Sequence, residues 1–204
     1  MNAELSDEML LRAYCSGDED AFDLLFRRFA PRVHATAFRL TSSWEDADDT
    51  MQEVFVRLAR KASTIRRGSA LPSWIYRTTV NRSMDCLRRR RRTISLDAPE
   101  TPAARVIAFE SVRREAERER SRRRDELLER IEGLIPRLPE RQSAVFVLRS
   151  FQGLSHREIA DALECSEASC RSHYSLACRK MREWCARVEA KEALAAGPEG
   201  ARPS

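Results

Sequence analysis

Arginine and serine side chains recur along one face of the helix that the sequence predicts over residues 167–185. At about 100° per residue, one side of this helix collects apolar residues, and the other collects basic and hydroxyl residues with no acid among them. The second set consists of Arg171, Ser172, Ser175, Arg179 and Arg182. Arginine can read base edges in a major groove, while serine and arginine can contact phosphates. Together with a capped helix over residues 155–163, this face predicts a helix-turn-helix that binds duplex DNA, with a merely solvated face as the alternative.

Five acidic side chains fall within the nine residues from Glu45 to Glu53. Three of them, Asp46, Asp49 and Glu53, share one face of a predicted helix. Carboxylates in a first turn complement the helix dipole, which is one interpretation of the cluster. The other interpretation is a docking surface for a basic partner. Paired carboxylates can also bind a metal ion, but no histidine lies close in sequence, and the pattern does not predict a metal site.

Aromatic and basic side chains adjoin one another in residues 74–92. The aromatic and polar members are followed by five consecutive arginines, and the whole set is Trp74, Tyr76, Arg77, Asn81, Arg82 and Arg88–Arg92. Rings that stack on unpaired bases, next to arginines that hold the backbone, favour binding to a single strand or a melted duplex. The alternative places Trp74 in the core and leaves the arginines as a solvated helix end. Adjacent like charges repel, however, unless an anionic partner is present.

The cysteines and histidines do not form a recognisable catalytic or metal-binding pattern. The six cysteines include no C-x-x-C pair, and their spacing fits no common zinc site even with His156 and His173 nearby. A free cysteine in a reducing cytoplasm behaves as a small hydrophobic residue, which is the favoured interpretation. The sequence contains no phosphate-binding glycine loop and no nucleophile motif. We therefore predict no enzyme activity, no cofactor and no metal.

The composition limits the class of protein that can carry these motifs. The chain has 204 residues, with 37 Lys and Arg against 32 Asp and Glu, a net charge of +5, and only three of the basic residues are lysine. Arginine binds phosphate in a bidentate manner, which favours a nucleic-acid partner. The longest apolar run, Ala144–Leu148, is far shorter than the ~20 residues that span a bilayer. The N-terminal residues lack a secretory signal pattern. We predict a soluble, cytoplasmic, all-α protein without membrane insertion.

Apolar residues at three- and four-residue spacing predict a first helical block that positions the acidic and aromatic segments. Ser6 can cap a short helix, and a longer helix begins at about Glu19. Pro31 lies inside this second helix and is expected to bend or break it. Two further helices are predicted at 44–62 and 71–90, with a loop at 65–70. The periodicity fails from residue 93 to 124, where few apolar residues offset the entropy of ordering.

A second helical block carries the predicted helix-turn-helix. Its first helix is stopped by Pro136, a second covers 139–151, and Ser155 with Glu158 forms a capping box for the third. Ser166 caps the last helix, which reaches about Ala190. The predicted organisation is two small helical domains joined by a flexible linker, followed by a disordered tail, with the ranges 1–92, 93–124, 125–190 and 191–204.

Three segments, taken in order, resemble the sigma factors of the extracytoplasmic-function (ECF) group of the sigma-70 superfamily. Residues 46–55 (DADDTMQEVF) are similar to the D-A-E-D-x-x-Q-E-x-F segment of region 2.2. Residues 74–89 (WIYRTTVNRSMDCLRR) resemble W-L-x-x-I-A-x-N-x-x-x-D-x-L-R-R of regions 2.3 and 2.4. Residues 138–146 (LPERQSAVF) and 153–160 (GLSHREIA) resemble the conserved parts of region 4. The resemblance covers residues 6–92 and 125–186.

The resemblance implies a non-enzymatic protein that binds core RNA polymerase and directs promoter-specific initiation. The first domain is expected to dock on the clamp helices of the largest polymerase subunit through Asp46, Asp49, Gln52 and Glu53. It is also expected to open the −10 element and hold its unpaired bases, with candidate residues Trp74, Arg77, Asn81, Asp85, Arg88 and Arg89. The second domain is expected to read the −35 duplex with the arginine and serine face of residues 167–182. An anti-sigma factor is an expected further partner.

The sequence departs from the family pattern near the start of the last helix. His173 and Leu176 stand where the family usually has arginine, which implies fewer phosphate contacts. Two other functions compete with the sigma-factor interpretation. One is a dimeric helix-turn-helix regulator that acts without docking to polymerase, although such a protein needs neither the acidic cluster nor the arginine run. The other is an interaction protein that senses thiol oxidation or zinc.

Overall fold

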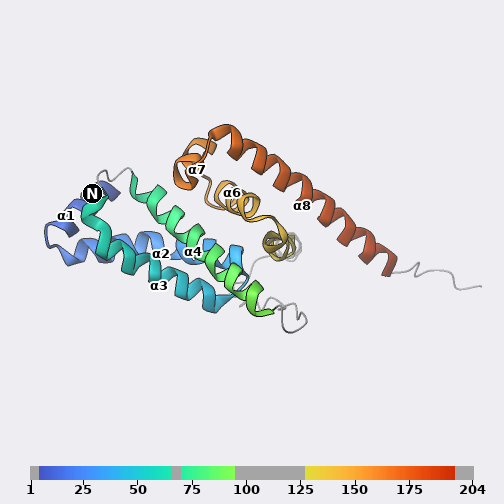
Figure 1. Ribbon diagram of the computed structural model, residues 1–204, viewed down its shortest axis with the longest axis horizontal. Coiled ribbons are helices and arrows are strands. Elements are labelled where there is room, and N and C mark those ends of the chain that lie inside the picture. The colour runs from blue at the N-terminus through green and yellow to red at the C-terminus, as the bar shows by residue number, and fades with distance from the viewer. Residues whose placement is uncertain (1–4, 66–69, 95–126, 196–204) are drawn as a thin grey trace, which may run out of the picture.

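The computed structural model describes residues 5–65, 70–94 and 127–195, and every regular element in these ranges is helical. Figure 1 shows two groups of helices, with the long last helix extending beyond the rest of the molecule. The first group is α1 (Asp7–Cys15), α2 (Glu19–Thr41), α3 (Trp44–Lys61), the short 3₁₀ helix η1 (Ala62–Thr64) and α4 (Leu71–Ile94). The second group is a helical segment at 127–134, η3 (Ile135–Arg137), α6 (Glu140–Ser150), α7 (His156–Leu163) and α8 (Glu167–Ala195). The all-α prediction is confirmed.

Side-chain caps set the starts of the helices. The hydroxyl of Ser6 accepts a hydrogen bond from the backbone N–H of Met9 at 3.2 Å, as predicted. Ser155 and Glu158 form the complete capping box at the start of α7, and Ser166 accepts from the N–H of Ser169 at 3.1 Å. Each cap satisfies a backbone donor that has no partner within its own helix. The starts of three helices could therefore be read from the sequence.

Pro31 does not break α2, so the expectation that it could end this helix was wrong. The helix is continuous from Glu19 to Thr41 with Pro31 inside it. Pro31 lies on the exposed side, whereas Phe29, Ala30 and Val33 around it are buried. Proline removes one backbone hydrogen bond at its position. The buried neighbours hold the turns on both sides of it, so packing outweighs that loss.

The first hydrophobic core lies among α1–α4. Leu25 and Val33 of α2 pack with Val54 and Leu58 of α3, and Ile75 of α4 closes the cluster. All five side chains are fully buried. Trp74 packs against this core and is half-buried, as the core interpretation of that residue predicted. The four helices therefore form a unit that fixes the direction of the acidic face on α3.

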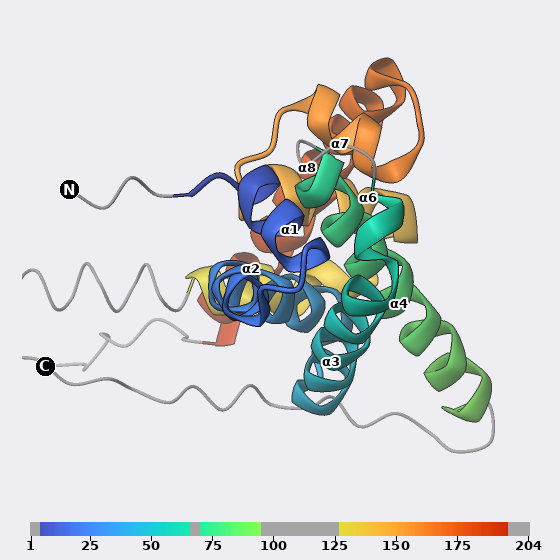
Figure 2. The same cartoon turned by 90° about the vertical axis from the view of Figure 1, so that its left-hand side faces the viewer.

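A second core joins the two groups of helices. Tyr76, Val80 and Met84 of α4 are buried in one cluster with residues of α6, α7 and α8, including Leu148 and Ile159. Figure 2 shows α7 above α2 and α4, and the yellow first segment of the second group at the height of α2. The predicted linker falls mainly on residues 95–126, and most of the predicted tail on 196–204, both of which lie outside the described residues. The two predicted domains are thus in direct contact.

No helix within the described residues is long and apolar enough to cross a membrane.

Candidate nucleic-acid interface

The acidic face of α3 lies at the surface of the first group. Ser43 caps α3 by accepting from the N–H of Asp46 at 3.2 Å, which orients the acidic first turns. Asp49 and Gln52 are exposed, and Asp46 and Glu53 are half-buried. The structure thus brings all four predicted polymerase-binding residues to one surface. Their role in polymerase binding stays a prediction.

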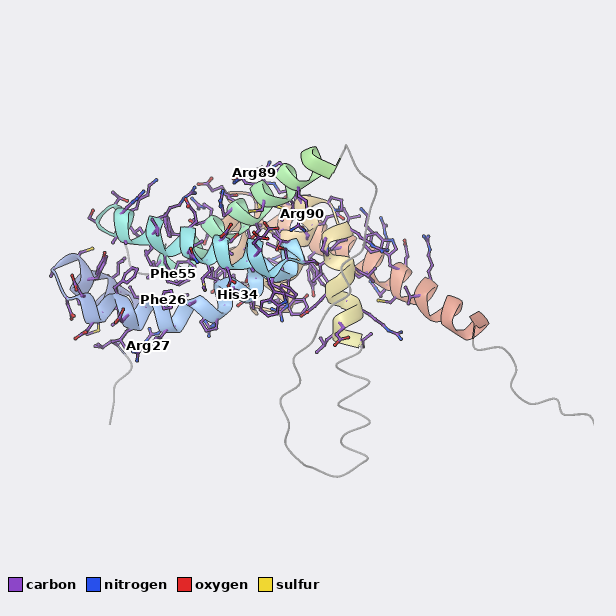
Figure 3. The ribbon with its side chains drawn as sticks, turned by 90° about the horizontal axis from the view of Figure 1, so that it is seen from below. Phe26, Arg27, His34, Phe55, Arg89 and Arg90 are labelled. Carbon is purple, nitrogen blue, oxygen red and sulfur yellow. The ribbon has the colours of Figure 1, made fainter. Side chains whose placement is uncertain are left out.

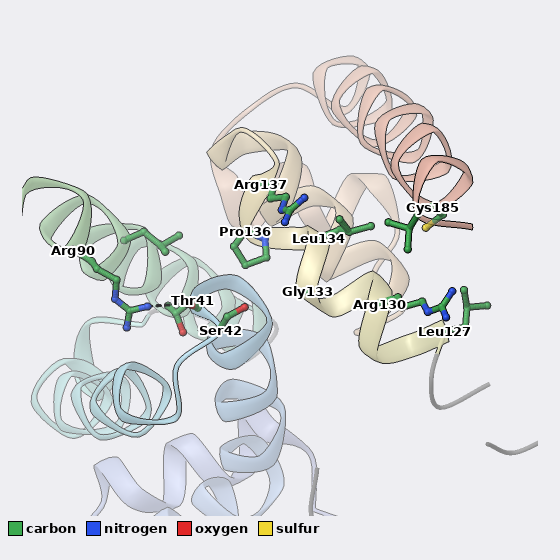
Figure 4. A pocket seen from close by; sticks show the side chains of 12 residues that line it. Thr41, Ser42, Arg90, Leu127, Arg130, Gly133, Leu134, Pro136, Arg137 and Cys185 are labelled. Atoms are coloured by element: carbon green, nitrogen blue, oxygen red, sulfur yellow. Dashed lines mark hydrogen bonds between the residues drawn. The ribbon is translucent and has the colours of Figure 1, made fainter. Parts of the chain in front are cut away.

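Two members of this face have arginine partners within the protein. The Arg57 guanidinium donates to Glu53 at 2.6 Å and lowers the pKa of that carboxyl. Asp46 pairs with Arg90 at the far end of α4, and Arg90 also donates to the carbonyl of Thr41 at 3.4 Å (Figure 4). Asp49 and Gln52 are the exposed part of the face. Their polar groups are therefore the most accessible to a partner.

An aromatic cluster borders the acidic face and could not be recognised from sequence spacing. Trp44, the first residue of α3, is 57% exposed. Its ring lies 4.7 Å from Phe38 and 5.1 Å from His34, centroid to centroid, and His34 contacts Asp48 at 3.1 Å. Exposed tryptophan next to charged groups is typical of protein-binding surfaces.

The arginine run has internal acidic partners that the sequence argument did not anticipate. Arg88 contacts Asp85 at 3.1 Å and Glu140 of α6 at 3.7 Å, and Arg90 pairs with Asp46. Arg89 is exposed near the C-terminal part of α4 (Figure 3). The side chains of residues 91 and 92 lie outside the described set. The Asp85–Arg88 spacing of three residues was the available signal, because such pairs share a helix face.

Arg77 of α4 caps the end of α7. Its guanidinium donates to the carbonyls of Ala162 at 2.9 Å and Asp161 at 2.7 Å, and it also pairs with Glu164. The last carbonyls of a helix lack partners within the helix, so a cation there is favourable. Arg141 of α6 adds a bond to the carbonyl of Leu163 at 3.2 Å. In this arrangement Arg77 joins the two helix groups. Its predicted role as a DNA contact stays a prediction.

The other predicted −10 residues lie at different depths on α4. Asn81, Asp85, Arg88 and Arg89 are exposed, while Trp74 is packed against the first core. Asn81 and Arg88 line the small pocket between α4 and α6 together with Arg77. The side of α4 that was expected to face melted DNA is therefore partly covered by the second helix group.

The arginine and serine face of α8 is open. Arg171, Ser172, Ser175, Arg179 and Arg182 are all exposed, and the apolar residues Cys170, Ala177 and Met181 are buried on the opposite side. This confirms the predicted division of the helix into two faces. Arg171 pairs with Glu167 one turn earlier on α8, an exposed pair that contributes little to stability. The predicted −35 contacts are thus placed together on one accessible surface.

A pocket of about 510 Å³ lies where the two groups meet (Figure 4). It is lined by Thr41 and Arg90 from the first group and by Leu134, Pro136 and Cys185 from the second. No group of three or more His, Cys, Asp or Glu side chains within the described residues is arranged to hold a metal ion.

Family models match both helix groups. Residues 25–93 match sigma-70 region 2, and residues 128–181 match sigma-70 region 4. The ECF RNA polymerase sigma factor SigM of Mycobacterium tuberculosis is 34% identical over 172 residues, covering 83% of this chain and 79% of the relative. The ECF RNA polymerase sigma-E factor of Escherichia coli K12 is 30% identical over 173 residues, covering 84% of this chain and 90% of the relative.

Two solved structures share the fold. CnrH, solved in complex with the cytosolic domain of CnrY, has a TM-score of 0.65 at 20% identity. The match covers 89% of this chain and 97% of the CnrH chain. RpoE of Bartonella quintana, solved with the anti-sigma factor NepR, has a TM-score of 0.62 at 20% identity. The match covers 79% of this chain and 94% of the RpoE chain. With both regions matched in order, the chain belongs to the ECF group of sigma-70 factors, the alternative sigma factors that direct transcription initiation by RNA polymerase.

Proposed function

We propose that this sigma factor docks on core RNA polymerase through the acidic face of α3 and reads promoter DNA with α4 and α8. The observation that carries the proposal is the surface position of Asp49 and Gln52 on the same face as Asp46 and Glu53. The protein itself catalyses no reaction in this account. It supplies sequence specificity to the polymerase, in the cytoplasm where the polymerase and the promoter are found.

The acidic face has the chemistry of a docking surface for a basic helix pair. Exposed carboxylates steer a cationic partner and fix its register. Trp44 adds an apolar anchor at the border of the face, with its ring held by Phe38 and His34. Aromatic anchors contribute most of the binding energy in many protein interfaces, with charged groups around them. The clamp helices of the largest polymerase subunit are the proposed partner.

We assign recognition of the −35 duplex to α8. Arg171 and Arg179 lie two turns apart on the exposed face, a spacing that suits successive contacts along a major groove. Ser172 and Ser175 lie beside them and have hydroxyl groups for phosphate oxygens. His173, where the family usually has arginine, is half-buried.

We assign the −10 element to α4, and this assignment requires the two helix groups to separate. Arg77 contacts Glu164, only three residues before the start of α8. The two predicted DNA sites are therefore neighbours in this structure. The −10 and −35 elements lie about 25 base pairs apart, which is about 85 Å of duplex. One molecule contacts both elements only after α4 and α7 have moved apart.

An anti-sigma partner belongs to the same proposal. The related RpoE of Bartonella quintana was solved in complex with the anti-sigma factor NepR. A partner that holds the two helix groups together would keep α4 covered and thereby prevent promoter binding.

Reconstituted transcription tests the proposed docking. Core RNA polymerase with the wild-type chain is expected to initiate on a subset of a promoter library, and the two are expected to co-purify. Asp49→Arg reverses a charge at an exposed position and should abolish co-purification while leaving helicity unchanged. Asp23→Arg makes the same charge reversal at an exposed site of α2 and should bind normally.

Normal docking by the Asp49→Arg variant would show that the acidic cluster only complements the helix dipole. DNA binding by the free chain as a dimer, without any initiation, would favour the helix-turn-helix regulator instead.

A further inference from the structure

Two cysteines meet across the turn of the helix-turn-helix. Cys165 lies in the turn between α7 and α8, and Cys170 lies in the first turns of α8. Their sulfur atoms are 3.3 Å apart, and both are free thiols. This pairing was not recognised from the sequence, because a spacing of five residues matches no common thiol motif.

The backbone holds both thiols in fixed positions. Glu164 ends α7 in the left-handed conformation at φ 52°, and its N–H donates to the carbonyl of Ala160. The N–H of Cys165 donates to the same carbonyl at 3.1 Å. Ser166 then caps α8 through the N–H of Ser169. A disulfide has a sulfur separation of about 2.05 Å, so closing this pair requires a movement of about 1.3 Å.

The two thiols differ in their access to solvent. Cys165 is half-buried, whereas Cys170 is fully buried at 0% exposure. Burial raises the pKa of Cys170 to about 12, and the neighbouring Cys165 contributes to the increase. A small oxidant in solution therefore reaches Cys165 first, and Cys170 is accessible mainly to the sulfur of Cys165. This is the arrangement of a reacting thiol and a resolving thiol.

We propose that Cys165 and Cys170 are a dithiol that hydrogen peroxide oxidises to a disulfide across the helix-turn-helix. The Cys165 thiol loses its proton, and the thiolate attacks one peroxide oxygen. The O–O bond breaks, Cys165 becomes a sulfenic acid, and the departing hydroxide takes up that proton and leaves as water. The sulfur of Cys170 then attacks the sulfur of Cys165. The S–O bond breaks, and the hydroxide leaves as a second water with the Cys170 proton. Both sulfurs are oxidised by one electron each, and the peroxide is reduced.

The disulfide would form directly beneath the predicted DNA-reading face. Arg171 and Ser172 follow Cys170 in sequence and are exposed on that face. A covalent link to the turn ties the start of α8 to the end of α7. The proposal itself concerns only bond formation, and its test does not depend on polymerase docking.

Thiol counting after peroxide treatment tests the proposal. The full chain is used in a Cys15→Ser background, because Cys15 is exposed and reacts independently. Treated protein should lose two alkylatable thiols, and mass spectrometry should find residues 165 and 170 in one linked species lighter by two hydrogens. A reductant should restore both thiols.

Matched variants identify the pair. Cys165→Ser, at a half-buried site, and Cys170→Ala, which keeps a small apolar group, should each abolish the linked species. Cys178→Ser changes a half-buried cysteine of the same helix and should leave the linked species unchanged. Circular dichroism confirms that each variant is folded.

Three results would overturn the proposal. The treated protein could keep all its thiols, the linked species could join other cysteines, or Cys165 could proceed to sulfinic acid without any link to Cys170.

Discussion

The two long arginine-bearing helices α4 and α8 were both predicted to bind DNA, yet their polar faces have different surroundings. On α8 the five predicted contacts are exposed, and their apolar counterparts are buried on the other side. On α4, Tyr76, Val80 and Met84 are buried against the second helix group, and Arg77 caps α7. The arginines of α8 are therefore exposed on an accessible face, whereas Arg77 of α4 connects the two helix groups.

This difference couples promoter binding to the arrangement of the two helix groups. Arg39 of α2 contributes to the same boundary, because it contacts Glu132 at 2.9 Å and lies 4.3 Å above the ring of Phe151. Tyr76 donates toward Gln152 at 3.3 Å. Contacts between domains within one chain resemble transient interfaces, and such domains commonly move relative to one another. We expect α8 to be competent for DNA in this arrangement and α4 to require opening.

The largest expected effect comes from a charge placed at the buried boundary. Val80 is 4% exposed and lies in the core that joins the groups. Val80→Glu buries an unpaired carboxylate, which costs several kcal/mol and should drive the groups apart. Small-angle X-ray scattering should record a larger radius of gyration with helicity retained. Val56→Glu, at an exposed position of α3, should leave the radius unchanged. An unchanged radius for Val80→Glu would contradict the covered state of α4.

The open face of α8 is tested by removing its arginines. Arg171→Ala and Arg179→Ala should each weaken binding to −35 duplexes by on the order of 1–3 kcal/mol if the residue contacts a base. Co-purification with core polymerase should be unaffected, and so should the radius of gyration. Arg12→Ala, on an exposed residue of α1, is the control. Equal loss of polymerase binding in the α8 variants would show that this face was assigned incorrectly.

Arg77→Ala tests the connector and should have a smaller effect. The side chain is 34% exposed, so solvent screens its pair with Glu164. Loss of its bonds to the α7 carbonyls should weaken the closed arrangement by on the order of 1 kcal/mol. Fluorescence energy transfer between probes on α3 and α8 should decrease. Arg27→Ala, on an exposed residue of α2, should leave the transfer unchanged. If Arg77→Ala and Arg27→Ala change the energy transfer equally, Arg77 does not hold the two helix groups together.

The capping box of α7 gives the smallest effect and a pH dependence. Ser155→Ala should destabilise the fold by about 1 kcal/mol at neutral pH. Hydrogen bonds from Ser155 lower the pKa of Glu158 below its ordinary value of 4.5, so the charged carboxylate stabilises the folded state. That contribution is present above pH 4.5 and is lost as the pH falls through the folded pKa. Thermal unfolding at neutral and acidic pH measures this effect. The difference in unfolding free energy between Ser155→Ala and the wild type should be smaller at acidic pH than at neutral pH.

Local signals in the sequence were enough to predict the helices and the α8 face. Caps at Ser6, Ser155 and Ser166 define helix starts because the side chain and its backbone partner are three residues apart. The two faces of α8 follow from the helical repeat. The open acidic face of α3 was predicted in the same way. These features depend on neighbours within a turn or two of helix.

Features that depend on long-range packing could not be predicted. Arg77 meets α7 more than eighty residues away, and nothing in its own segment distinguishes a helix cap from a DNA contact. Pro31 stays in a continuous helix because buried residues on both sides hold it. Arg90 reaches Asp46 only because α3 and α4 lie side by side. The Cys165–Cys170 contact depends on the left-handed turn at Glu164.

The distance between the helix groups, measured with and without polymerase, tests the central claim most directly. Spin labels can be placed at Val56 of α3 and Glu183 of α8, which are both exposed. The account predicts one distance in the free protein, set by the packed helix groups, and a distance longer by tens of ångströms in an initiating complex with core polymerase and promoter DNA, since the two elements lie about 85 Å apart. An initiating complex that keeps the distance of the free protein would contradict the account.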